Sequence, residues 1–225
     1  MQEPKTIDLS KKPLLKIWHD ISYWLQKTFQ RQKLYRQVAI HESGHIVFSY
    51  FYGFTVRQAK LIVTKPGNGF TETVYGKEAA VANIIFNVLI GDFVRQNLDT
   101  QKHIHRIAVR LMVILYAGSV GEAFVKRKPK DTGYNLEVSG EDLAALKIIQ
   151  DFLHTTGFRM SDSDVVKNAF DLYERFPIFK QGIEALTNEF LKSTTLSLTQ
   201  KQIEDTLTAT NFFAVREQII DAKSN

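Results

Sequence analysis

The 225-residue chain is predicted to fold as a mainly α-helical protein with one small β-hairpin, an α+β class. Along most of the sequence, apolar residues recur at steps of three or four, which is the spacing of a helix face that packs on a core. The exception is a pair of short runs rich in β-branched residues, Ala59–Thr64 and Phe70–Tyr75. They flank the turn signal Lys65–Gly69, so the pair is expected to form a hairpin.

The first predicted helix follows a loose polar tail, Met1–Ser10, and runs from Pro13 to about Phe29. Its apolar residues fall on one side: Leu14, Ile17, Trp18, Ile21, Trp24, Leu25 and Phe29. We expect this stripe to pack on the protein's own core, as amphipathic helices usually do. Contact with a membrane surface or a partner groove is the alternative.

The basic charge of the chain is concentrated in the same region. Residues 11–36 carry seven basic side chains and one acidic side chain, Asp20, a net charge of +6 in a chain whose total is +5. The basic residues are Lys11, Lys12, Lys16, Lys27, Arg31, Lys33 and Arg36. Because the rest of the chain is close to neutral, no nucleic-acid surface is predicted.

Further helices are expected over Lys77–Gln96, over Ile107–Val125 and from Glu141–Asp142 through Phe152. About three more are expected between Asp162 and Ile220, with a break at Pro177. The run Ile107–Val125 approaches the length of a membrane span. Charged and small residues within it favour a buried helix instead.

The pattern that carries chemistry is His41-Glu42-Ser43-Gly44-His45, an HExxH motif. Residues four apart lie on one face of a helix, so His41 and His45 can bind one zinc ion. Glu42 would then act as the general base that takes a proton from the attacking water. The histidines share the apolar face formed by Leu34, Val38 and Phe48, and Gly53 is a plausible end of this helix. The alternative is a pair of hydrogen-bonded core histidines beside a solvated Glu42.

A catalytic zinc needs a third protein ligand, and the residues alone leave several carboxylates open for this role. These are Asp142, Glu122, Asp92, Glu72 and Glu141. His103 and His105 are two apart and diverge on a helix, so they are expected to be solvated or structural. His19 and His154 stand in no supporting pattern.

Three segments resemble the peptidase domain of FtsH-type, ATP-dependent zinc metalloproteases. Val38–His45 is similar to the family's motif helix, with serine at position 43 where alanine is usual. Tyr116–Glu122 is similar to its small-residue helix, and Ser139–Leu143 looks like the segment that completes the zinc site. The resemblance implies that Asp142 is the third ligand and that Glu122 lies near the site, behind the ligands. It also implies that the hairpin around Leu61–Tyr75 binds substrate backbone.

The chain departs from this family in three respects. It has no GxxxxGK[ST] phosphate-binding loop, and no transmembrane helix is evident before the motif. The spacing from His45 to Asp142 is also longer than the family's, with extra residues around 96–106 and 126–135. The family's hexameric ring is therefore not implied, and the oligomeric state stays open.

The sequence thus predicts an N-terminal tail and basic amphipathic helix over residues 1–30 and a zinc metallopeptidase domain over residues 31–225. The expected cofactor is Zn²⁺ and the expected substrate a flexible or unfolded polypeptide, hydrolysed without ATP in this chain. A catalytically silent, FtsH-peptidase-like scaffolding module is the alternative. The chain has no cysteine and begins with no signal-peptide pattern. A cytoplasmic protein is therefore expected, peripheral to a membrane if residues 11–36 bind one.

Overall fold

The computed structural model describes residues 13–61, 69–74, 84–85, 87, 89–125, 136, 138 and 140–224. It describes side chains for residues 31–61, 71, 84, 85, 87, 89–124, 136, 138 and 140–222. Within these residues the fold is mainly helical with one small antiparallel sheet, so the predicted fold class is confirmed.

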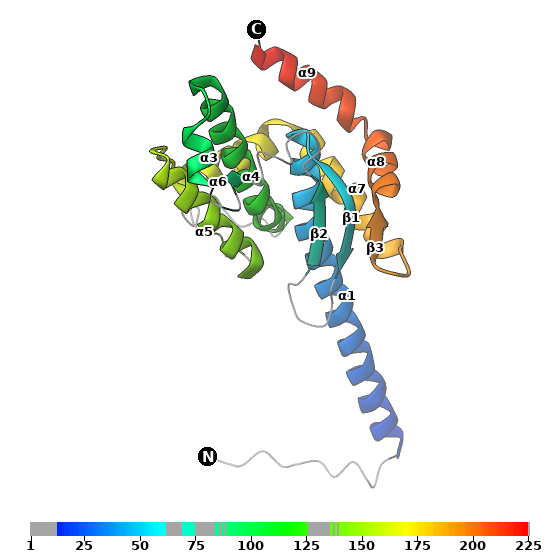
Figure 1. The fold of residues 1–225 in the computed structure, drawn as a ribbon. Helices are drawn as coiled ribbons and strands as arrows, with labels where there is room; N and C mark the ends of the chain where they lie inside the picture. The colour runs from blue at the N-terminus through cyan, green and yellow to red at the C-terminus, as the bar shows by residue number, and fades with distance from the viewer. Residues whose placement is uncertain are drawn as a thin grey trace, which may run out of the picture.

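The longest element is helix α1, Pro13–Phe51, which crosses residue 30 without a break. Its C-terminal half lies inside the body of the protein and contacts α4, α7, β1 and β2. Its N-terminal half runs out from that body, and none of the described elements lies beside it (Figure 1). The side chains of the apolar stripe from Leu14 to Phe29 lie outside those described, so its expected packing on the core stays a prediction. The predicted stop is confirmed, because Gly53 adopts a φ of 86° and the chain turns back through a hydrogen bond from Phe54 N to Ser49 O.

The sheet contains three described strands in the order β2-β1-β3. Strands β1, Thr55–Leu61, and β2, Gly69–Val74, are antiparallel, so the predicted hairpin pairing is confirmed. Residues 62–68 and Tyr75 lie outside the described residues. Strand β3, Ser197–Thr199, pairs with the other side of β1 and was not predicted, because three residues are too short to show a period of two.

The helix predicted over Lys77–Gln96 is wrong in its second half. Leu89 is not helical (φ −78°, ψ 67°), and a short helix, α3, Ile90–Val94, begins after it. Asn87 lies in a turn just before this point. An asparagine side chain competes for backbone hydrogen bonds and so favours such turns. Residues 77–83 of this prediction lie outside the described part of the chain.

Helix α4, Leu98–Val125, forms the centre of the core beside α1 (Figure 1). It begins nine residues before the predicted Ile107, where the backbone N–H of Thr100 donates to Oδ1 of Asn97 at 2.9 Å. Its first turns are polar and exposed, so hydropathy did not reveal them. Among the described residues it is the one helix long and apolar enough to cross a membrane. In the most apolar 18-residue stretch of α4, 72% is buried inside the protein. The core helix of a soluble protein is buried in the same way.

Helix α5, Gly140–Thr155, begins as predicted near Glu141–Asp142. Four helices follow rather than the three expected: α6, Asp162–Arg175, α7, Pro177–Lys192, α8, Gln200–Ala209, and α9, Phe212–Ser224. Pro177 is the first residue of α7, where its missing N–H costs no helical hydrogen bond. Within this framework, α1, α4, α5 and β2 contribute the side chains described next.

Candidate metal centre

Three potential ligands meet between α1 and the start of α5. Nε2 of His41 lies 3.3 Å from Oδ2 of Asp142, and Nε2 of His45 lies 3.4 Å from the same oxygen. All three ligand atoms lie within 4.8 Å of one another, and both imidazoles are buried. His41, His45 and Asp142 can therefore hold a metal ion.

The two histidine–aspartate separations are compatible with a metal ion that has short bonds, of which zinc is one example. In a tetrahedral site with bonds of about 2.0–2.2 Å, neighbouring ligand atoms are about 3.3–3.6 Å apart. The two His–Asp separations have this value. Two imidazoles with one carboxylate are ligands that zinc accepts readily, and three protein ligands leave a position for water.

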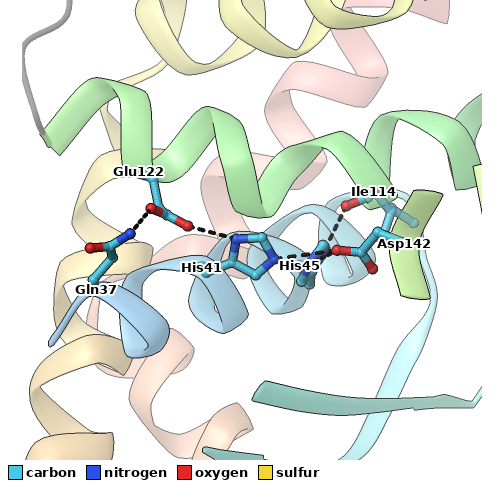
Figure 2. Close-up of polar contacts among 6 residues, drawn as sticks. All are labelled: Gln37, His41, His45, Ile114, Glu122 and Asp142. Atoms are coloured by element: carbon cyan, nitrogen blue, oxygen red, sulfur yellow. Dashed lines mark hydrogen bonds and ion pairs between the residues drawn. The ribbon is translucent and has the colours of Figure 1, made fainter. Parts of the chain in front are cut away.

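Each histidine is oriented through its other ring nitrogen (Figure 2). Nδ1 of His41 donates to Oε1 of Glu122 at 2.9 Å, and Nδ1 of His45 donates to the carbonyl oxygen of Ile114 at 2.8 Å. Both acceptors come from α4. These bonds keep a proton on Nδ1, so that Nε2 would be the nitrogen that gives its lone pair to a metal ion.

Glu122 is itself held in place from α1. Nε2 of Gln37 donates to its Oε2 at 2.6 Å, and Gln37 lies one helical turn before His41 (Figure 2). Glu122 thus lies behind His41, on the side away from Asp142. The sequence analysis did not single out Gln37, although its position four residues before His41 places it on the same helix face.

Two glycines allow α1 and α4 to approach closely enough for these contacts. A Cβ atom on Gly44 would lie 2.4 Å from the carbonyl oxygen of Ala117. A Cβ atom on Gly118 would lie 2.6–2.7 Å from three atoms of the His41 ring. The imidazole therefore packs directly on the backbone of α4. On α1, the buried hydroxyl of Ser43 accepts a hydrogen bond from the hydroxyl of Thr187 on α7 at 3.4 Å.

The pKa of the His41 imidazole is strongly shifted by its neighbours. Burial by itself lowers its pKa, but the hydrogen bonds to Asp142 and Glu122 and the charges of Glu42 and Asp142 outweigh burial and raise the pKa to about 10. His41 is then protonated at neutral pH. An incoming metal ion has to displace this proton.

Glu42 is 4% exposed and points toward the sheet rather than into solvent. Its Oε2 accepts a hydrogen bond from Oγ1 of Thr71 on β2 at 2.5 Å. Burial raises the pKa of Glu42, and the charges of the two histidines and the Thr71 hydrogen bond oppose this rise. A raised pKa suits a carboxylate that has to accept a proton near neutral pH. Nothing in the local sequence pattern pointed to Thr71.

The remaining candidates lie elsewhere. Asp92 is exposed and pairs with Arg95, which follows the end of its helix, and Glu141 and His154 are exposed. His105 hydrogen-bonds Thr156 and packs against Phe93 and Phe158, a structural role that fits the sequence prediction. Among the described histidines and carboxylates, the three-ligand group is His41, His45 and Asp142. The side chains of His19 and Glu72 lie outside the described residues.

Comparison with models of known protein families and with curated proteins found no match. The geometry of the site is therefore the basis of the functional argument.

The close packing of α4 on His41 predicts that Gly118→Ala disturbs the metal centre. The added methyl group collides with a ring held at both nitrogens, so we expect stability to fall by about 1–3 kcal/mol and metal affinity to fall at least about tenfold. Thermal unfolding and competition with a zinc chelator measure the two effects. Gly121→Ala is the control, because its Cβ meets only ordinary contacts of 3.5 Å or more. Equal losses of stability and of metal affinity in the two variants would contradict the prediction.

Because Asp142 and Glu122 lie at different positions in the site, we expect their substitution to reduce metal binding by different amounts. Asp142→Ala removes a ligand, so we expect no stoichiometric zinc in the purified variant. Glu122→Gln leaves all three ligands but weakens the hydrogen bond to His41, so we expect zinc affinity to fall about 10- to 100-fold. Metal analysis and chelator competition distinguish the two. If Glu122→Gln lost all zinc while Asp142→Ala retained it, Glu122 would be the ligand instead.

Proposed function

We propose that this protein is a zinc-dependent metalloendopeptidase that hydrolyses flexible or unfolded polypeptides without ATP in this chain. The observation that carries the proposal is a group of three potential metal ligands with a buried carboxylate, Glu42, next to it. His41, His45 and Asp142 would hold the zinc ion, and Glu42 follows His41 directly on the same helix. A structural zinc has no use for such a base, whereas a hydrolase does.

The role proposed for each residue follows from its contacts. When bound, zinc lowers the pKa of water to about 7 and polarises a carbonyl group. Glu42 takes a proton from the attacking water and later gives it to the leaving amine. Glu122 and the Ile114 carbonyl keep the two imidazoles in the orientation that exposes Nε2. The low exposure of the site excludes bulk water, which strengthens these interactions.

The sheet offers a site for the substrate backbone. In the described part of the sheet, β2 pairs with β1 alone and is an edge strand. An extended peptide can add to such an edge by main-chain hydrogen bonds, which read little of the side-chain sequence. Because Thr71 of β2 contacts Glu42, a peptide on this edge lies close to the base. This supports the expected substrate-binding role of the hairpin around Leu61–Tyr75 and a preference for flexible chains.

The proposal predicts that Glu42→Gln abolishes peptide cleavage and leaves zinc bound. Glutamine keeps the shape of glutamate but cannot accept the proton, so we expect casein digestion to fall at least about 100-fold. Chelator treatment of the wild-type protein should stop digestion, and restored zinc should recover it. Glu141→Gln is the matched control, because that glutamate is exposed at the start of α5. A zinc-bound wild-type protein that cleaves no unfolded substrate would favour the scaffolding alternative.

We also propose a location for this activity. A chain without cysteine is suited to the reducing cytoplasm, and the N-terminal half of α1 would hold the protein at an anionic membrane surface. That half extends from the body (Figure 1) and belongs to the segment with a net charge of +6. Its sequence also contains two tryptophans, which favour membrane interfaces.

The membrane proposal predicts that Lys16→Glu with Lys27→Glu weakens binding to vesicles containing phosphatidylserine. Each basic residue near an anionic surface contributes about 1 kcal/mol, and two reversals should lower vesicle partitioning at least about tenfold. Sedimentation with vesicles measures this, and added salt should mimic the loss. Lys180→Glu with Lys192→Glu on α7 is the control, because both lysines are exposed on the body. Equal binding by both double variants would refute the proposal.

A further inference from the structure

The edge strand and the base of the proposed peptidase are joined by one side-chain contact. Oγ1 of Thr71 donates to Oε2 of Glu42 at 2.5 Å, and the two residues come from β2 and α1. A hydrogen bond from a hydroxyl to a charged carboxylate is among the stronger ones in proteins. The contact lies where Glu42 is buried, so water competes little for it.

The geometry of α1 alone does not fix the direction of Glu42. A glutamate side chain has three rotatable bonds, and its helix determines only the face from which it projects. Among the residues that the structure describes, Thr71 is the one that donates a hydrogen bond to its carboxylate. That bond holds Oε2 and so restricts the directions that the carboxylate can take.

We propose that Thr71 is the positioning residue for Glu42, so that the strand that receives the peptide backbone also sets the direction of the base. This inference rests on the proposed peptidase function and adds a role that the HExxH motif does not contain. Thr71 lies in the middle of β2, opposite Ala59 of β1, so its position is fixed by the sheet. The base is thereby aligned with the strand along which the scissile peptide would lie.

The contact itself can be tested without any measurement of activity. Thr71→Val keeps the β-branched shape that suits a strand and removes only the hydroxyl. Glu42→Met keeps the length of the side chain and removes the acceptor. In a double-mutant cycle followed by urea unfolding, we expect the two substitutions to be coupled by about tenfold or more in the unfolding equilibrium constant. Additive effects within about twofold would overturn the inference, whether or not the protein is a peptidase.

The catalytic consequence is tested with the zinc-loaded protein and a fluorogenic peptide. We expect Thr71→Val to lower kcat about 10- to 100-fold, with KM and zinc content unchanged, because a misdirected base slows the chemical step alone. Thr71→Ser restores the hydroxyl and should recover most of the rate. In the Glu42→Gln background, Thr71→Val should cause no further loss.

Other outcomes would overturn the positioning role. If Thr71→Val kept the wild-type kcat, or if Thr71→Ser lost as much rate as Thr71→Val, the hydroxyl would not direct the base. A change in KM alone would assign Thr71 to peptide binding. An inactive wild-type protein with a coupled Thr71–Glu42 pair would refute the peptidase proposal and leave the contact established.

Discussion

The crossing of α1 and α4 at Gly44 and Gly118 is the constraint on which the site depends. With no side chain at either position, the two helices come close enough for the His41 ring to rest on the backbone of α4. The same approach brings Glu122 and the Ile114 carbonyl within hydrogen-bonding distance of the two imidazoles. A wider crossing would separate both histidines from their acceptors, and the direction of each Nε2 atom would then be unspecified.

The ionisable groups at this crossing pair with one another. Burial of ionisable side chains costs several kcal/mol each unless partners compensate for the lost water. Here His41 lies between Asp142 and Glu122, and these contacts raise its pKa to about 10 despite its burial. A metal ion that binds Nε2 of His41 would therefore have to displace its proton. A dication bound at Nε2 would replace that proton as the partner of Asp142, while Glu122 would keep its hydrogen bond with Nδ1.

Much of this arrangement could be predicted from the sequence. The mainly helical fold, the hairpin pairing and the start of α5 follow from apolar periodicity and turn residues, which act over a few neighbours. Asp142 was one of five candidate carboxylates by residue type, and it was singled out only through a family resemblance. The predictions that were wrong also have local causes. The helix expected over Lys77–Gln96 breaks near Asn87, and the polar first turns of α4 gave no hydrophobic signal.

The sequence by itself determined that His41 and His45 share one helix face with Glu42 beside them, because a spacing of four residues and the helical repeat fix this without any other part of the chain. The tertiary structure decided which carboxylate approaches the histidines and what holds the base. Asp142 is 101 residues from His41 in the chain, and Thr71 is 29 residues from Glu42. Contacts over such separations depend on how α4, α5 and β2 pack around α1, and no local pattern of residues specifies that packing.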